Sequence, residues 1–297
     1  RRVILVTAGY GNQARRLIPL LAAAGTSVRA LRRSAAGEEE VRALGASEVV
    51  VGDAADPAVL ARAMEGVEAV FHVGPTAHPR ESELGIAAVD AAAAAGVGHF
   101  VYSSVLHARI SALVQHREKQ IVEEHLVGAP IPFTILQPAD FMETLNYKRA
   151  FREGVFELIW SLERAQSLVS VGDVAEVAAR ILAEGETHHG ATYELSSPGA
   201  FSAHEIAATI AELTGREVVA RRLEVESVLG FYGHDEYGEE GREYRRRFFA
   251  ALTGWYDAHD FVGNPRVLGW LLGREPTSLR EFLTAYRDRH GGFRERV

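Results

Sequence analysis

Residues 3–14 read VILVTAGYGNQA, and this short stretch decides the fold class. The run Val3–Val6 is continuously apolar, as in a parallel strand that is buried on both faces. Directly after it, Gly9, Gly11 and Ala14 give the spacing G-x-G-x-x-A ahead of an amphipathic helix. In this spacing the first glycine permits a tight turn and the second lets the backbone approach a pyrophosphate, while the small third residue lets the helix pack on the strand. A strand, a glycine-rich turn and a helix in this order predict a dinucleotide-binding turn.

The beginning of the predicted helix supplies further contacts of this turn. The first N–H groups of a helix have no partner within it, and they bind phosphates. Asn12 and Gln13 open the helix. We therefore expect the cofactor's pyrophosphate to contact Gly9, Gly11, Asn12 and Gln13.

The remainder of the first half repeats the alternation of strand and helix. Such alternation with short turns is typical of parallel strands joined by right-handed crossovers. The sequence therefore predicts an α/β fold, a doubly wound parallel (Rossmann) sheet with a smaller α+β C-terminal substrate lobe. The further strands are expected at 28–31, 48–51, 68–73, 99–103 and 133–136.

The pattern becomes less regular after about residue 140. A helix is expected over 173–184 with Asp173 as its N-cap, followed by a short strand over 192–195. Ser202 with Glu205, and Ser278 with Glu281, have the spacing of a capping box at a helix start. We expect a dinucleotide-binding domain of residues 1–150 plus about 168–198, and a substrate-binding lobe of about 151–167 plus 199–297.

The end of the second predicted strand bears on the choice of nucleotide. A site specific for NAD usually places an acid there, about 20 residues after the glycines, to bind the ribose 2′-hydroxyl. Residues 28–34 read VRALRRS and contain no acid. Arg32 and Arg33 could instead bind a 2′-phosphate through charge-assisted hydrogen bonds. We therefore expect NADP(H) in preference to NAD(H).

Composition excludes several classes of function. The 297 residues carry a net charge of -8 and no cysteine, which excludes thiol nucleophiles, disulfides and cysteine-ligated metals. The negative charge argues against a nucleic-acid partner, and no apolar run approaches the roughly 20 residues of a membrane span. His188 and His189 lack the spaced acids and histidines of a metal site. We expect a cytoplasmic protein without a metal.

Five further blocks stand out along the chain: GDAADP at 52–57, FVYSSVLH at 100–107, HREKQIVEEHL at 116–126, FTILQPADFMETL at 133–145 and GDVAEVAARIL at 172–182. In their order and spacing these blocks resemble the NmrA-like branch of the atypical short-chain dehydrogenases/reductases. Members of this family are Rossmann proteins with a smaller C-terminal lobe. Some are NAD(P)H-dependent reductases of quinones and phenylpropanoid compounds, and others are redox sensors that bind the nucleotide without known catalysis.

The resemblance implies roles for individual residues. Arg33 matches the arginine that meets the 2′-phosphate, and Asp53 would lie near the adenine. Lys119 matches the lysine that contacts the nicotinamide ribose in active members. Ser103, at the end of a strand, could hydrogen-bond substrate or cofactor. The stretches expected beside the ribose and nicotinamide are Val73, Gly74 and Pro75 after the fourth strand, and Gln137, Pro138 and Phe141 after the sixth.

The chain also departs from the family pattern. Ala8 and Ala14 stand where glycine is usual, although Gly9 could compensate for Ala8. The wider superfamily uses a proton-donating tyrosine four residues before the lysine, and this chain has Gln115 there. His116 could replace it, because its ordinary pKa of about 6.5 suits acid–base catalysis, so Lys119 and His116 are the catalytic candidates. The weaker alternatives are His107, Tyr102, Tyr232, Tyr237 and Tyr256.

Three functions remain open from the sequence. The first is an NADPH-dependent reductase of a small aromatic or conjugated carbonyl or quinone compound, with residues 229–262 as a lid over the substrate. The second is a non-catalytic NADP(H) redox sensor that regulates a protein partner. The third is a non-redox cyclase or isomerase that reuses the same pocket. A homodimer is compatible with all three.

Overall fold

A computed structural model describes residues 2–229 and 237–290. The expected proton donor Tyr232 lies outside these residues, and so does part of the expected lid. The chain divides into two compact units. The first unit comprises Arg1–Ser111, Gln115–Pro138 and Val171–Glu194, and the second comprises Ala112–Val114, Ala139–Ser170 and Leu195–Val297.

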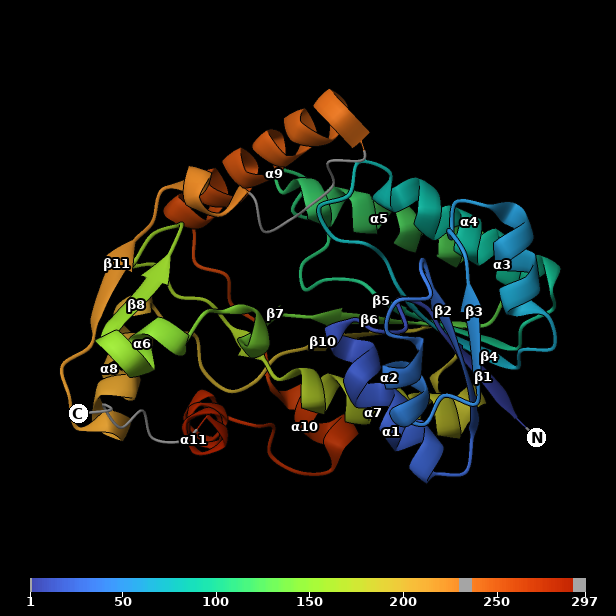
Figure 1. Ribbon diagram of the computed structural model, residues 1–297, viewed down its shortest axis with the longest axis horizontal. Helices are drawn as coiled ribbons and strands as arrows, with labels where there is room; N and C mark the ends of the chain where they lie inside the picture. Colours follow the sequence, from blue (N-terminus) through green and yellow to red (C-terminus); the bar gives the residue numbers. More distant parts are fainter. Residues whose placement is uncertain (1, 230–236, 291–297) are drawn as a thin grey trace. The chain divides into compact units, whose positions relative to one another are not determined.

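A seven-stranded sheet forms the centre of the first unit (Figure 1). Its order is β10-β6-β5-β4-β1-β2-β3, and strands β1 to β6 pair in parallel. The order reverses between β1 and β4, which is the point where open α/β sheets bind ligands. The prediction of a doubly wound α/β fold is confirmed. The strands are β1 (Val3–Val6), β2 (Ser27–Arg32), β3 (Glu48–Val51), β4 (Ala69–Val73), β5 (His99–Ser103), β6 (Phe133–Pro138) and β10 (Ala191–Leu195).

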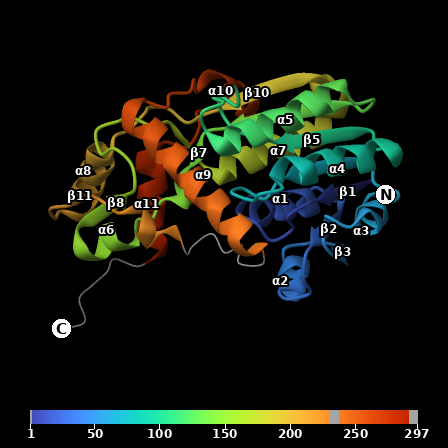
Figure 2. The same cartoon turned by 90° about the horizontal axis from the view of Figure 1, so that it is seen from above.

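Helices cover both faces of this sheet. Helices α3 (Pro57–Met64), α4 (Glu81–Ala94) and α5 (Val114–Gly128) lie on one face, while α1 (Asn12–Ala23) and α7 (Val171–Glu184) pack together on the other (Figure 1). Figure 2 shows α4 and α5 side by side across their face. Helix α2 (Glu38–Ala43) follows β2. The core beneath α3, α4 and α5 is apolar and includes Phe100 and Tyr102 of β5.

The start of α7 corrects one sequence prediction. The helix begins at Val171, so Asp173 lies in its first turn and is not the N-cap. Val171 is 1% exposed and Asp173 is 2% exposed. Because Val171 is buried, the helix begins two residues before Asp173, the residue whose side chain favoured the N-cap position.

The second unit has its own apolar core, built around Tyr147, Phe151 and Phe156. Both predicted capping boxes are confirmed, at Ser202 before α8 and at Ser278 before α11. Among the described residues, no helix is both long and apolar enough to cross a membrane. The elements are β7 (Asp140–Phe141), α6 (Lys148–Glu153), β8 (Val155–Leu158), β9 (Leu168–Val169), α8 (Ala203–Thr214), β11 (Val219–Arg222), α9 (Gly238–Ala258), α10 (Arg266–Leu272) and α11 (Leu279–Arg289), with short 3₁₀ turns η1 (Met142–Thr144) and η3 (Val225–Ser227), while η2 (Gly185–His188) belongs to the first unit.

Most of the described part of 229–262 is helix α9, although the sequence suggested a loop. The helix buries an apolar stripe that includes Tyr244, Phe248 and Tyr256, and this stripe explains why the segment is ordered as a helix. Its role as a lid remains a prediction.

Candidate functional site

The glycine turn joins β1 to α1 at the carboxyl edge of the sheet. The Gly9 N–H donates to the Leu31 carbonyl over 3.0 Å, and a Cβ at Gly9 would lie 2.8 Å from the Ala30 Cβ. Gly9 is therefore required by its close packing on β2. The left-handed backbone of the turn falls on Ala8, whose φ is +50°. Gly9 lies within the predicted tight turn, which the Gly11 N–H closes by donating to the Ala8 carbonyl over 2.8 Å, although Ala8 takes the left-handed torsion. That Gly9 compensates for Ala8 stays a prediction.

Helix α1 begins without a side-chain cap. Its N-cap residue is Gly11, with φ −68° and ψ 167°, and no side chain bonds to the first turn. A Cβ at Gly11 would approach the Ala8 carbonyl oxygen to 3.3 Å. Asn12 is exposed, whereas the buried Gln13 accepts a hydrogen bond from the Ser103 hydroxyl over 2.9 Å. Ser103 and Gln13 thus connect β5 to the start of α1, and the N-cap residue Gly11 supplies no side-chain acceptor to the N–H groups of that start.

Aromatic and basic side chains gather beside the turn. The guanidinium of Arg15 lies 3.9 Å from the centre of the Tyr10 ring, and that of Arg32 lies 4.8 Å from it. Arg32 also donates to the Gly37 carbonyl, while Arg33 is exposed. Sequence reasoning selected Arg32 and Arg33 but missed Tyr10 and Arg15. A basic residue one turn into a helix after a glycine turn is the signal that could have identified Arg15.

Acidic side chains surround the loop after β2. A hollow of about 610 Å³ is lined by residues 38–40, which are all glutamate, together with Gly37 and Arg42. Asp53, after β3, is exposed and accepts a hydrogen bond from the Ala55 N–H over 2.8 Å. The charge near Arg32 is therefore mixed.

The segment after β4 is fixed by a buried polar contact. The Val73 N–H donates to the Thr7 hydroxyl over 3.0 Å, and the same hydroxyl lies 3.0 Å from Nδ1 of His72. Burial, with a smaller effect from the charge of Lys119, lowers the pKa of His72 to about 3. His72 is therefore neutral. Gly74 is buried and Pro75 is half-buried directly beyond it.

Lys119 is buried and paired. Its ammonium donates to Oε1 of Glu81 over 2.6 Å, with 7% of the Lys119 side chain and 1% of the Glu81 side chain exposed. A Cβ at Gly74 would lie 3.6 Å from that same Glu81 oxygen. The pair therefore lies against the segment after β4, where the sequence predicts the nicotinamide ribose. Sequence reasoning found Lys119 and missed Glu81.

Three buried side-chain oxygen atoms lie near the pair of Glu81 with Lys119 or on the elements that carry it. Oε2 of Glu81, Oγ of Ser104 and Oε1 of Gln115 have no hydrogen-bond partner in the described part of the chain. Such atoms are costly unless a ligand or water satisfies them. Glu81 begins α4, Ser104 follows β5, and Gln115 lies one turn before Lys119 on α5.

The environment of His116 does not suit the acid–base role that the sequence suggested. Its side chain is buried, and its Nδ1 lies 3.0 Å from the His107 carbonyl oxygen. Burial is the largest effect on the His116 imidazole, and it lowers the pKa to about 4. A neutral imidazole at pH 7 is a poor proton donor, which favours Lys119 over His116. Tyr102 is also buried, and burial raises its pKa well above the ordinary value.

The residues predicted to follow the sixth strand divide between the units, and Gln137 and Pro138 prove to be the last two residues of β6. Gln137 donates to Oε1 of Glu123 over 2.8 Å, and the Pro138 carbonyl accepts from the Leu106 N–H over 2.8 Å. Both contacts lie in the first unit. Phe141 belongs to the second unit, where β7 pairs with β9.

The NmrA-like family profile matches residues 1–249, which is more than half of the chain. The chain belongs to the NmrA-like family. An NAD(P)H azoreductase of Xenophilus azovorans is 33% identical over 224 residues, which cover 73% of this chain and 75% of that protein. A (4-alkanoyl-5-oxo-2,5-dihydrofuran-3-yl)methyl phosphate reductase of Streptomyces griseus is 34% identical over 230 residues, which cover 76% and 78%. The crystal structure of an NADPH-dependent quinone oxidoreductase from Escherichia coli has a TM-score of 0.72 at 25% identity, covering 95% of this chain and 99% of its own.

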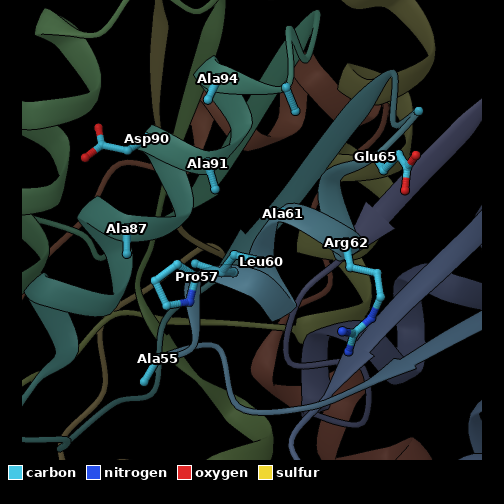
Figure 3. A pocket seen from close by; sticks show the side chains of 12 residues that line it. Ala55, Pro57, Leu60, Ala61, Arg62, Glu65, Ala87, Asp90, Ala91 and Ala94 are labelled. Carbon is cyan, nitrogen blue, oxygen red and sulfur yellow. The ribbon is translucent and has the colours of Figure 1, made fainter.

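A second surface feature of this NmrA-like chain lies away from the predicted cofactor residues. Figure 3 shows a pocket of about 840 Å³ between α3 and α4, lined mainly by small apolar side chains such as Ala87 and Ala91. None of the residues predicted to bind the cofactor lines it. Among the described residues, no group of three or more histidine, aspartate or glutamate side chains could hold a metal ion.

Proposed function

We propose that this NmrA-like chain is an NADPH-dependent reductase of a small aromatic or conjugated carbonyl or quinone compound. The choice of a reduction rests on the names of two relatives. They are 33% and 34% identical to this chain over about three quarters of each chain, and each is named as a reductase. The residues at the carboxyl edge of the first unit support this choice.

The residues present fit a dinucleotide. The uncapped start of α1 offers N–H groups to a pyrophosphate, and Gly11 has no side chain to block it. Arg33 would bind the 2′-phosphate. Arg32 precedes it in the sequence, and Arg15 lies over the same Tyr10 ring as Arg32. At the other end, Lys119 and the segment 73–75 would hold the nicotinamide ribose. The buried oxygens of Ser104 and Gln115 add hydrogen-bonding capacity for a polar ligand.

The reaction divides between cofactor and protein. A bound nicotinamide supplies hydride. The protein binds and orients the reactants through the glycine turn and Lys119. Reduction of a carbonyl oxygen also requires a proton, and the ammonium Nζ of Lys119 is the group we assign to it, with solvent restoring the proton. Gln115 holds no proton that it can release at neutral pH.

Calorimetric titration with NADPH, NADH, NADP and NAD tests the nucleotide. Arg33→Ala should weaken NADPH binding about tenfold or more, because it removes a charge-assisted hydrogen bond to phosphate, and should leave NADH binding nearly unchanged. Arg42→Ala is the matched control, since Arg42 lies in the nearby α2 and pairs with Glu38. Equal affinity of the wild-type protein for NADPH and NADH would overturn the preference.

Turnover separates the reductase from the redox sensor. The wild-type protein should oxidise NADPH with at least one member of a panel of quinones, enones and azo dyes. Tight NADPH binding without turnover on the whole panel would instead favour the non-catalytic sensor, for which Gln115 in place of tyrosine is the supporting observation. Product formed without loss of NADPH would favour the isomerase or cyclase.

A further inference from the structure

The contact between Glu81 and Lys119 joins two helices that lie side by side. Glu81 is the first residue of α4 and Lys119 lies on α5, and Figure 2 shows the two helices adjacent. Other polar pairs bridge the same helices: Glu118 accepts from the Ser82 hydroxyl over 2.5 Å, and Nε2 of His125 lies 2.6 Å from Oδ1 of Asp90. In each of these pairs at least one partner is half-buried or exposed. The pair of Glu81 with Lys119 is buried on both sides.

Stability alone is a poor reason for this buried pair. Removal of two charges from water costs several kcal/mol per ion, and apolar residues of similar volume often stabilise a core as well or better. A carboxylate also interacts favourably with the start of a helix, but the exposed Glu83 already supplies that charge in the first turn of α4. The position of Glu81 therefore needs an explanation other than helix or core stability.

We propose that Glu81 is the positioning residue of Lys119, holding its ammonium on the side of the segment after β4 for contact with the nicotinamide ribose. The proposal rests on the proposed function. Oε1 of Glu81 both accepts from Lys119 and lies closest to Gly74, so one oxygen fixes the lysine at the segment after β4. A four-carbon side chain without such an acceptor would sample many rotamers, and binding would have to order it.

The charges around the pair agree with a fixed ammonium. Burial raises the pKa of the Glu81 carboxyl, Lys119 lowers it, and Glu118 raises it. His72, on β4, is kept neutral partly by the charge of Lys119. Tyr102, on β5, is kept protonated by burial and by the charge of Glu81. His72 and Tyr102 therefore add no further charge beside the pair of Glu81 with Lys119.

A double-mutant cycle tests the proposal. Glu81→Gln should raise the Kd for NADPH about tenfold and lower kcat/KM for NADPH by a similar factor or more, while kcat at saturating NADPH should fall less than in Lys119→Gln, which removes the proton donor itself. Lys119→Gln should raise the Kd at least as much. The double variant should bind no worse than Lys119→Gln alone, because Glu81 acts through the lysine. Additive losses, or an unchanged Kd in Glu81→Gln, would overturn the proposal.

The controls separate positioning from folding. Glu83→Gln changes an exposed carboxylate on the same helix and should leave both Kd and kcat unchanged. Thermal unfolding is recorded for each variant. If Glu81→Gln alone does not fold, the double variant, which leaves no lone buried charge, and Glu81→Asp carry the test. Glu81→Asp keeps both the carboxylate and Lys119, so it should bind NADPH more tightly than Lys119→Gln does. Equal affinity of these two variants would overturn the proposal. If the wild-type protein itself fails to bind NADPH, the proposed function fails first.

Discussion

Helix α1 of the first unit and helix α11 of the second begin in opposite ways. Helix α11 is capped by Ser278 and Glu281 in a complete capping box, as α8 is by Ser202 and Glu205. Helix α1 begins at Gly11, which has no side chain to accept from its N–H groups. The second unit thus satisfies these helix starts within itself, whereas the first unit leaves hydrogen-bonding capacity where the proposed cofactor binds.

The buried titratable groups of the two units differ in the same way. The first unit buries His72 and His116, and burial lowers their pKa values to about 3 and about 4. The second unit buries Asp140, whose pKa burial raises to about 6 even though Tyr256 donates a hydrogen bond to it over 3.1 Å. The first unit also buries His99, whose pKa burial lowers to about 4, and Glu81, whose carboxyl pKa burial raises. Glu81 offsets part of the effect of the three histidines, so acid should on balance destabilise the first unit, whereas Asp140 should stabilise the second.

The largest expected effect is that of acid on the first unit. Above pH 6.5 these histidines are neutral in both folded and unfolded chains, whereas below it the unfolded chain gains protons first. Stability is then lost as the pH falls, by about 2 kcal/mol for each histidine between pH 7 and pH 4.5. Asp140 has a raised folded pKa, so its contribution is lost as pH rises through about 6 and is recovered on acidification.

Amide hydrogen exchange, corrected for the intrinsic rate at each pH, measures the two units separately. His72→Phe is the control, because phenylalanine does not titrate and can stack on Tyr102 as the imidazole does. This variant should show a pH dependence about 2 kcal/mol smaller in the first unit. Equal loss of protection in both units on acidification would contradict the comparison.

A smaller effect is expected at the caps of the second unit. Ser278→Ala should lower the free energy of unfolding by about 1 kcal/mol, because it removes the acceptor for the N–H of Glu281. The affinity for NADPH should not change. Ser227→Ala, at a serine that does not begin an α-helix, should cost less than about 0.5 kcal/mol. Urea unfolding with calorimetric titration measures both quantities, and a changed NADPH affinity in Ser278→Ala would break the contrast with α1.

The smallest effect concerns the two alanines that replace family glycines. Ala8→Gly should stabilise the protein by about 0.5 kcal/mol, because relief of the left-handed backbone outweighs the added freedom of the unfolded chain. Ala14→Gly should destabilise it by about 1 kcal/mol, because residue 14 lies inside a helix. Thermal unfolding measures the change in stability of both variants. A change of the same sign in both would show that the backbone of the turn differs from the one described.

Much of the first unit could be predicted because its central strands are buried on both faces. The runs at 3–6 and 99–103 match the observed strands residue for residue, and so does 48–51, although β3 is a partly exposed edge strand. Lys119 was found through the family pattern. Glu81 was missed because an acid at the start of an alanine-rich helix resembles any helix-dipole residue, and its partner is 38 residues away.

Backbone conformation was harder to predict than topology. The glycine pattern correctly placed Gly9 in the tight turn, but the positive φ falls on Ala8, and Gly9 is also needed for its approach to Ala30. The spacing of small residues shows where the backbone comes close to something. It does not show which residue takes the unusual torsion or which neighbour is approached.

The discontinuous path of the first unit has a consequence for synthesis on the ribosome. Strand β6 ends at Pro138, and β10, which pairs beside it, ends at Leu195, after the chain has passed through 139–170 of the second unit. A nascent chain therefore carries an unpaired β6 edge until about residue 195 has emerged. Exposed strand edges are sites of intermolecular pairing, so translation through this interval is when the protein is most prone to aggregation, and fragments ending within it should be the least soluble.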